Sequence, residues 1–217
     1  MAAIGILACE PEWPTQLTTQ TSPNLTVDAV VEGVHLKFET ESRLFSPQGI
    51  DAGTASLLTH VHFHENDKVL DLGCGYGVIG IYAARRISPK QVFLVDNDPA
   101  AVSCAMRNAQ LNAVESIHIQ CSEGFRGLSE KDFTKILCNP PYHTDFAVAK
   151  HFIEKGFNRL VVGGSMWMVT KREDWYRNKL KSIFGGVRLT RQNSYIVFEA
   201  IKKSDSYAGS LAHNGEQ

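Results

Sequence analysis

An asparagine, two prolines and a tyrosine follow one another at residues 139–142, within the sequence CNPPYHTD. The side-chain oxygen of Asn139 and the carbonyl of Pro140 are both hydrogen-bond acceptors, since proline keeps its carbonyl although it lacks an N–H group. Together they could hold the two N–H groups of an amine or amide nitrogen. Each proline ring fixes its own φ angle, so the acceptors would be in place before a substrate arrives. The ring of Tyr142 offers a flat face on which a base or a planar amide could stack. The segment is a candidate acceptor site, with a surface turn as the alternative.

Gly73, Gly75 and Gly77 follow a short apolar strand and precede a helix in VLDLGCGYGVIG. Glycines in this position allow a tight turn and let the backbone approach a ligand closely. Asp71 lies just before the loop, where we expect its carboxylate to face the ligand. A carboxylate there repels a pyrophosphate but attracts the ammonium and sulfonium groups of S-adenosylmethionine. The loop therefore favours a cationic ligand. A dinucleotide is the alternative, because Gly80 completes that spacing as well.

Two further acidic residues come directly after predicted strands. Asp96 ends a strand in LVDND, within reach of ribose hydroxyls; a helix cap is the alternative, because Pro99 follows closely. Glu123 follows the next strand in CSEGF and could accept a hydrogen bond from an adenine amino group, or simply lie in solvent. We assign both residues, with their neighbours Asn97 and Ser122, to cofactor binding.

The elements that must position these residues begin at Lys68, from which short apolar strands alternate with helices. We expect strands at KVLDL, QVFLV, SIHIQ, FTKILC and SMWMVT, and two closing strands at VRLT and YIVFEAI. We expect helices at GVIGIYAARR, PAAVSCAMRNAQLN and DFAVAKHFIEKGFNRL, and an amphipathic helix that ends at Gly185-Gly186. Such alternation predicts an α/β fold with a mostly parallel, seven-stranded sheet covered by helices on both faces. Ligands bind at the carboxyl ends of such strands, where the candidate residues fall.

The chain divides into three predicted parts. Residues 1–38 are expected to form an arm and a β-hairpin, because apolar residues alternate on both sides of Glu32-Gly33. Residues 39–203 form the main domain, and the small polar residues 204–217 a flexible tail.

Bulk properties exclude several classes of protein. The 217 residues carry a formal net charge of -1, so no overall charge marks a nucleic-acid or membrane partner. No stretch has membrane-spanning length, and no membrane partner is expected. The five cysteines are scattered without a Cys-x-x-Cys pair, which favours a reducing, cytoplasmic location over a disulfide framework. His60, His62 and His64 fall where a helix should end, so we expect no metal site.

The order Asp-x-Gly-x-Gly-x-Gly, an acidic end to the second strand and Asn-Pro-Pro-Tyr after the fourth resembles class I S-adenosylmethionine-dependent methyltransferases acting on amino or amide nitrogens. The resemblance narrows with FSPQGIDAGTASLL, NPPYH and the terminal run WMVTKREDWYRNKLKSIFGGVRLTRQNSYIVFEAIK. These stretches resemble the "methyltransferase small" family, the bacterial ribosomal RNA guanine-N2 methyltransferases, over roughly residues 30–203.

The resemblance implies a Rossmann-like class I fold, S-adenosylmethionine as cofactor, and methyl transfer to the exocyclic N2 amine of a guanine in ribosomal RNA. It places Gly53 and Thr54 over the methionine end of the cofactor, and Asn139 and Tyr142 at the acceptor. Adenine N6 and a protein glutamine amide are alternative acceptors. A noncatalytic RNA-binding module and a nicotinamide oxidoreductase are alternatives of other classes.

Seven basic residues and two acids lie between Lys171 and Arg191, with Trp175 and Tyr176 among them. Such a run is either a solvated helix face or a contact with an RNA backbone. We assign its first members, Lys171 and Arg172, to substrate binding, together with His143 after the prolines. The sequence indicates no oligomeric state.

Overall fold

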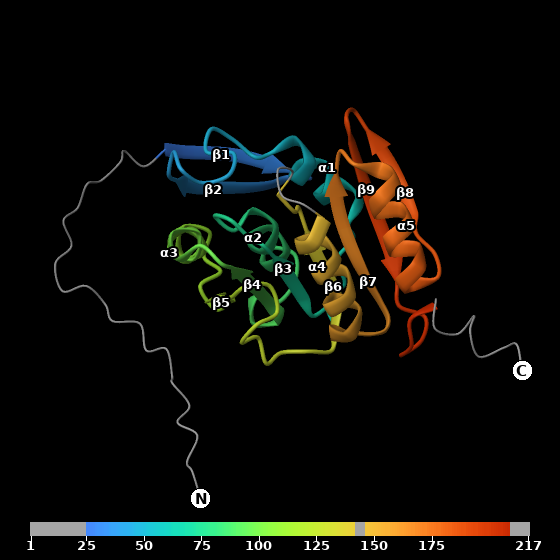
Figure 1. The fold of residues 1–217 in the computed structure, drawn as a ribbon. Helices are drawn as coiled ribbons and strands as arrows, with labels where there is room; N and C mark the ends of the chain where they lie inside the picture. The colour runs from blue at the N-terminus through green and yellow to red at the C-terminus, as the bar shows by residue number, and fades with distance from the viewer. Residues whose placement is uncertain (1–24, 142–145, 209–217) are drawn as a thin grey trace, which may run out of the picture.

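A seven-stranded sheet forms the centre of the fold, in the strand order β5-β4-β3-β6-β7-β9-β8 (Figure 1). The computed structural model describes residues 25–141 and 146–208. Strands β3 to β7 run parallel, whereas β9 is antiparallel to both β7 and β8. The strands are β3 (Val69–Leu72), β4 (Val92–Asp96), β5 (His118–Cys121), β6 (Phe133–Cys138), β7 (Leu160–Thr170), β8 (Arg188–Gln192) and β9 (Tyr195–Ile201).

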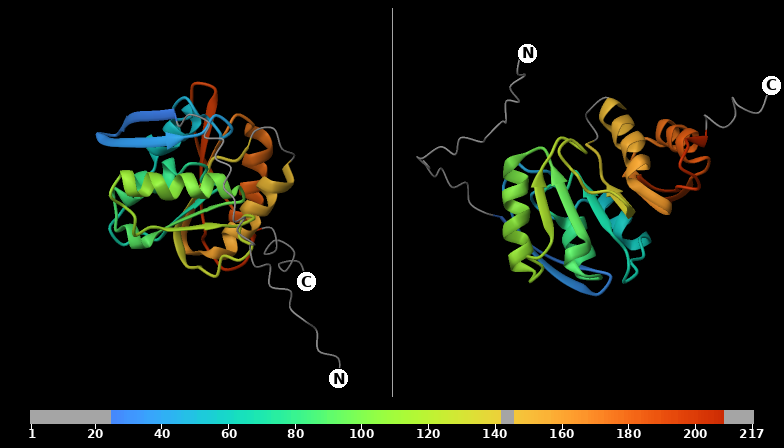
Figure 2. Two further views of the ribbon diagram at one scale, coloured as in Figure 1. Left: turned by 90° about the vertical axis from the view of Figure 1, so that its left-hand side faces the viewer. Right: turned by 90° about the horizontal axis from the view of Figure 1, so that it is seen from below.

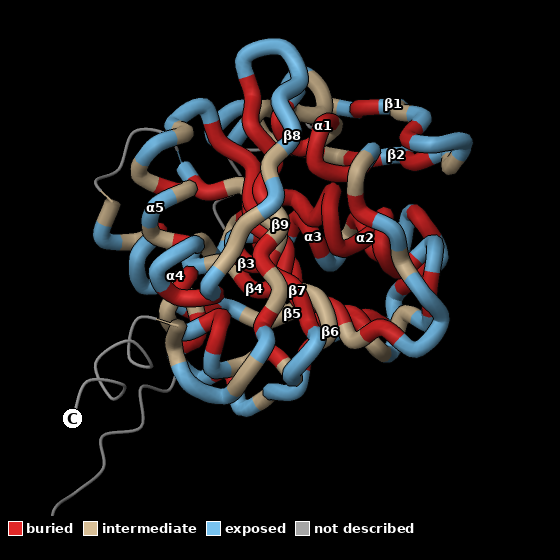
Figure 3. Tube along the Cα trace, turned by 90° about the vertical axis from the view of Figure 1, so that its right-hand side faces the viewer, coloured by how far each residue is buried: buried red, intermediate tan, exposed pale blue. Residues whose placement is uncertain are grey.

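Helices cover both faces of this sheet, as the alternating pattern predicted. They are α1 (Ala52–His60), α2 (Val78–Ala84), α3 (Pro99–Leu111), α4 (Phe146–Arg159) and α5 (Glu173–Phe184), with a short 3-10 turn η1 (Pro89–Gln91). Helices α1, α2 and α3 share one buried cluster with alternate strand residues such as Val69, and α4 and α5 share another with residues such as Leu70. Figure 2 shows α4 and α5, in gold and orange, together on one side. Strands β3, β4 and β9 are almost continuously buried, whereas the edge strands β5 and β8 are largely exposed (Figure 3).

The fold class and the strand and helix order are confirmed, with one difference in extent. Strand β7 begins at Leu160 rather than at Ser165. Gly163-Gly164 interrupts the apolar pattern there, but the backbone of both glycines bonds to Lys202 across the sheet. Glycine forms backbone hydrogen bonds between strands as other residues do. The two glycines therefore interrupt the apolar pattern of the sequence without interrupting the strand.

The predicted hairpin is present as a separate two-stranded sheet of β1 (Leu25–Val31) and β2 (Val34–Thr40) (Figure 1). Two buried asparagines, Asn108 near the end of α3 and Asn112 at its C-cap, pair with the backbone of β2. Asn112 accepts from the N–H of Lys37 at 3.1 Å and donates to its carbonyl at 2.7 Å. Asn108 does the same to Glu39, at 2.7 and 2.8 Å. Its amide also donates to the carbonyl of Tyr76 in the glycine loop, at 2.9 Å. Asn108 thus ties the hairpin to the loop.

Replacing Asn108 with alanine should lower the free energy of unfolding by about 3 kcal/mol, because the N–H of Glu39 and the carbonyl of Tyr76 lose this partner, while the carbonyl of Glu39 keeps the thiol of Cys104 at 3.0 Å. Urea unfolding measures the loss. The exposed Gln110→Ala on the same helix is the matched control and should change stability by less than about 0.5 kcal/mol. Equal midpoints for the two variants would contradict this role of Asn108.

The end of the described chain differs from the expected flexible tail. The hydroxyl of Tyr207 donates to the carbonyl of Glu154 at 3.1 Å, and its ring packs edge-on against Phe157. One aromatic residue in an otherwise small and polar segment is enough to dock it on α4. Residues 209–217 lie outside the described part. Within the described ranges, no helix is long and apolar enough to cross a bilayer.

Candidate active site

A cavity of about 380 Å³ opens at the carboxyl ends of β3, β4 and β6, where a parallel sheet is expected to bind its ligand. Its walls come from the glycine loop and from the segments 45–54, 122–124 and 139–141. Nine of the predicted site residues line it: Thr54, Gly73, Gly75, Asp96, Asn97, Ser122, Glu123, Asn139 and Pro140. The sequence therefore brought nine predicted residues to one cavity, and their roles toward a ligand stay predictions.

The glycine loop is held by the end of the neighbouring strand. Gly73, Gly75 and Gly77 all have positive φ, at 78°, 54° and 98°, which a side chain would disfavour. Asp96 accepts a hydrogen bond from the N–H of Gly75 at 2.8 Å. Asp96 does not cap the following helix, since Asp98 does so through the N–H of Ala100. Asp96 thus both lines the cavity and shapes its loop. Gly77 lies behind the wall, at the start of α2.

Asp71 does not face the cavity, and this prediction was wrong. Its side chain is fully buried and accepts from the N–H of Gly80 at 2.8 Å. Side chains along β3 alternate between the two faces of the sheet. Asp71 therefore lies with Val69 on the face covered by α2, whereas Leu72 lies on the other face and lines the cavity. Burial raises the pKa of the Asp71 carboxyl to about 7; the Gly80 hydrogen bond opposes the rise and the charge of Asp96 adds to it. Its Oδ1 is buried and finds no hydrogen-bond partner among the described residues.

The amide of Asn139 has a fixed orientation. Its Nδ2 donates to Oδ2 of Asp51 and to Oγ1 of Thr54, both at 2.9 Å. These two bonds determine which end of the amide is the acceptor: the carbonyl oxygen. The next residue, Pro140, is buried at the same wall. The two residues predicted to supply the oxygen acceptors, Asn139 and Pro140, therefore both line the cavity. Tyr142 and His143 lie outside the described residues.

Two residues of this cluster were missed by the sequence analysis. Asp51 caps α1 by accepting from the N–H groups of Gly53 and Thr54, at 2.8 and 3.1 Å. Its Oδ1 accepts from the hydroxyl of Tyr195 at 3.2 Å. An aspartate just before a helical pattern is a cap signature, so Asp51 could have been found. Tyr195 lies in a closing strand, and nothing local in the sequence indicates its role.

The charge of the cavity favours a cation. Three carboxylates, Asp51, Asp96 and Glu123, belong to its described wall, and no lysine or arginine does. The buried Asp71 adds a fourth acid behind the loop. A pyrophosphate would meet repulsion here, whereas a sulfonium or ammonium group would be attracted. Nowhere in the described chain do three metal-ligating side chains gather.

The basic run does not reach the cavity wall. Lys171 lies over the ring of Tyr195, at 4.8 Å, and Arg172 over Phe146, at 5.1 Å. Four other members of the run form ion pairs with acidic residues: Arg177, Lys179, Arg188 and Arg191. Four of the seven basic residues of the run are therefore ion-paired, and whether Lys171 and Arg172 contact a substrate stays a prediction.

Comparison with known proteins gives concordant results. Residues 35–199 match the family model of the methyltransferase small domain. The ribosomal RNA large subunit methyltransferase G of Aeromonas hydrophila subsp. hydrophila is 30% identical over 207 residues, which cover 91% of this chain and 54% of that protein. Among solved structures, the 16S rRNA N2 methyltransferase RsmC of T. thermophilus, in complex with AdoMet and guanosine, matches with a TM-score of 0.73 and 25% identity. That match covers 83% of this chain and 51% of RsmC.

A further structure, TrmN from Thermus thermophilus, shares the fold at 20% identity and a TM-score of 0.59, over 70% of this chain and 48% of that one. The chain spans about half the length of the ribosomal RNA methyltransferases that it matches.

Proposed function

The chain belongs to the methyltransferase small domain family, and from this premise we propose that it transfers a methyl group from S-adenosylmethionine to the exocyclic N2 amine of a guanine in ribosomal RNA. The fixed amide of Asn139 at the cavity wall is the observation that carries the proposal. The relatives support the choice of acceptor, since one is a ribosomal RNA methyltransferase and another is a 16S rRNA N2 methyltransferase with AdoMet and guanosine bound.

The cavity suits this cofactor. S-adenosylmethionine supplies a methyl carbon bonded to a positively charged sulfur, which leaves readily as a thioether. The three wall carboxylates are what a cationic ligand would offset, and the buried Asp71 adds negative charge from behind the loop. All four predicted cofactor residues of this side line the cavity, and in this proposal Asp96 and Asn97 bind the ribose hydroxyls while Ser122 and Glu123 bind the adenine. Thr54 would contact the methionine end.

The acceptor nitrogen is the demanding part of the reaction, because its lone pair is delocalised into the base. Two oxygen acceptors that grip its N–H groups favour a pyramidal nitrogen and direct the lone pair toward the methyl group. Oδ1 of Asn139 and the carbonyl of Pro140 supply them, and the prolines keep them rigid. The N–H proton is acidic once the methyl has been transferred, so no strong general base is required. Tyr142 supplies the stacking face for the base.

The alternative acceptors are less well supported. Adenine N6 and a glutamine amide could be gripped by the same two oxygens, but neither is named by the relatives reported above. A nicotinamide oxidoreductase is disfavoured by the wall, which has three carboxylates and, among its described residues, no cation for a pyrophosphate.

The purified protein should transfer labelled methyl from S-adenosylmethionine to ribosomal RNA, and nucleoside mass mapping should identify N2-methylguanosine. Transfer RNA and total ribosomal protein are the parallel substrates. Label only in protein, or N6-methyladenosine as the sole product, would refute the guanine assignment.

Cofactor affinity should depend on pH through Asp71. The carboxyl has a pKa of about 7 in the free protein, so it is largely protonated at pH 6. A bound cation stabilises the ionised form of this carboxyl, so binding of S-adenosylmethionine should release a proton. The affinity for S-adenosylmethionine should therefore rise as the pH rises toward 7, by up to about tenfold per pH unit. Calorimetry between pH 5.5 and 8 measures the dependence.

Asp71→Asn should flatten that profile, because the asparagine cannot titrate. S-adenosylhomocysteine, which lacks the sulfonium charge, is the matched control ligand. Its affinity should change less with pH than the affinity for S-adenosylmethionine does. Parallel profiles for the wild type and the variant would show that another group titrates.

A further inference from the structure

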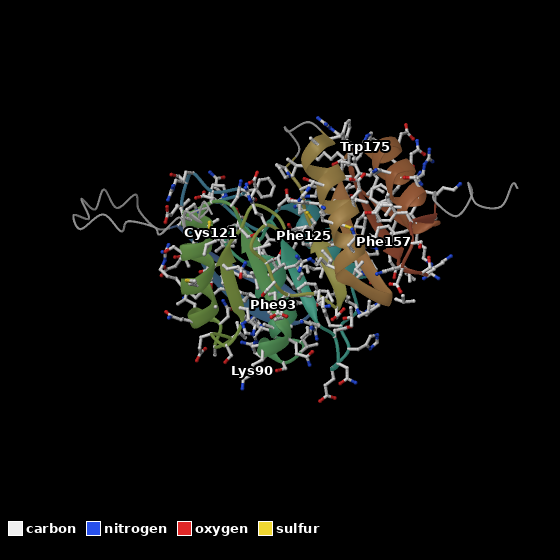
Figure 4. All side chains as sticks on the ribbon, turned by 60° about the horizontal axis from the view of Figure 1, so that its bottom comes forward. Lys90, Phe93, Cys121, Phe125, Phe157 and Trp175 are labelled. Atoms are coloured by element: carbon white, nitrogen blue, oxygen red, sulfur yellow. The ribbon has the colours of Figure 1, made fainter. Side chains whose placement is uncertain are left out.

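A second hollow, of about 750 Å³, adjoins the cavity and has no part in the chemistry above. It lies between the loop 123–126 and one face of α4, and we call it the α4 groove. Figure 4 shows Phe125, from this loop, beside α4. Glu123, Gly124, Val148 and Phe152 line both the cavity and the groove. The groove therefore adjoins the end of the cavity where the adenine of the cofactor would lie, on the side of α4.

The rim of the α4 groove is basic. Arg126, His151, Lys155 and Arg159 line it, against the single acid Glu123. His151 and Lys155 are exposed one turn apart on α4, and no described residue forms an ion pair with Lys155. Arg126 contacts Glu123 at 3.2 Å, but both side chains are mostly exposed, at 84% and 75%, so water weakens this pair.

Arg159 is held in place rather than mobile. Its guanidinium donates to the backbone carbonyls of Ser129 and Glu130, at 3.1 and 2.6 Å, and no carboxylate forms an ion pair with it within the described chain. Its charge is thus fixed at the groove and is not neutralised there. The cations of α5 differ, because Arg177 and Lys179 are each paired with an acid.

The floor of the groove is aromatic. The rings of Phe125 and Phe152 meet edge to face, with centroids 6.5 Å apart. Gly124 keeps this floor open, because a Cβ there would come within 3.0 Å of the Phe152 ring. A floor of aromatic rings with a rim of cations is the combination that binds single-stranded nucleic acid, with bases on the rings and phosphates on the cations.

We propose that the α4 groove binds the single strand of RNA that flanks the target nucleotide. The inference rests on the proposed function, since it takes RNA as the substrate. The cations of the rim hold phosphates, the half-buried ring of Phe152 contacts a neighbouring base with the buried Phe125 packed behind it, and the strand continues toward the wall that the groove shares with the cavity.

The test removes two rim charges in Arg126→Gln/Lys155→Gln. The matched control, Lys181→Gln/Lys203→Gln, removes the same charge from exposed positions that do not line the groove. Fluorescence anisotropy with a labelled single-stranded RNA oligonucleotide should show at least tenfold weaker binding for the groove variant and less than twofold weaker binding for the control. The slope of log K against log salt should become shallower by about 1.4 in the groove variant, because each lost phosphate contact contributes about 0.7.

Calorimetry with S-adenosylmethionine should give the same dissociation constant for all three proteins, which shows that they are folded. Equal losses of RNA binding in the two variants, equal affinity for a duplex of the same sequence, or no RNA binding by the wild type would each overturn the proposal.

Methyl transfer is recorded separately. If the wild type binds RNA through the groove but methylates none, the proposed function fails while the groove stands. If it methylates RNA and the groove variant has the kcat/KM of the control, the groove fails while the function stands.

Discussion

Replacing Asn139 with alanine is expected to lower the turnover number for methyl transfer about 100- to 1,000-fold, while the affinity for S-adenosylmethionine stays within about twofold. The reason is geometric. The amide of Asn139 donates to Asp51 and Thr54, so its carbonyl oxygen is set as an acceptor before the substrate binds. Alanine removes one of the two groups that grip the acceptor nitrogen, and that grip matters most when the nitrogen becomes pyramidal.

Single-turnover transfer to RNA and calorimetry with S-adenosylmethionine separate the two effects. Asn97→Ala is the matched control, because Asn97 also lines the cavity but on the cofactor side. It should raise the dissociation constant for S-adenosylmethionine and leave the rate of transfer at saturation nearly unchanged. If Asn139→Ala behaved like Asn97→Ala, Asn139 would be a cofactor residue and the acceptor site would have to be sought elsewhere.

The fold was predictable because its signals are local. Runs such as VLDL and FTKILC are buried on both faces, and Pro99 and Gly185 mark the ends of helices. The carboxyl ends of parallel strands meet at one edge, so strand order alone brought the glycine loop, Asp96 and Asn139 to one cavity.

The errors come from features that depend on side-chain direction or on distant partners. Asp71 is close to the loop in sequence, but the alternation of β3 turns it into the protein. The sequence left open whether the basic run is a solvated helix face or an RNA contact, and it could not show that two of its ion pairs reach acids outside the run: Lys179 with Glu154 on α4, and Arg188 with Glu199 on β9. Such pairs form only when the fold is complete.

The role of Asp51 shows how one residue links the fold to the chemistry. It caps α1, receives the hydroxyl of Tyr195 and receives the amide of Asn139. A helix cap requires only one short acceptor, which serine also provides. To orient Asn139, the side chain must carry an oxygen as far as the Asn139 amide, which aspartate does and the shorter serine does not. The two tasks can therefore be separated by substitution.

Asp51→Ser should keep the cap of α1, and with it the thermal midpoint within a few degrees, but lower turnover about 10- to 100-fold because Asn139 loses an anchor. Asp51→Asn keeps an oxygen toward Asn139 and an amide toward Tyr195, so it should retain most of the turnover at saturating S-adenosylmethionine. Combining Asp51→Ser with Asn139→Ala should cost little more than Asn139→Ala alone, because the serine variant acts only through Asn139. Additive losses in that double variant would show that Asp51 acts on the reaction independently, through its charge beside the methyl donor rather than through the amide that it orients.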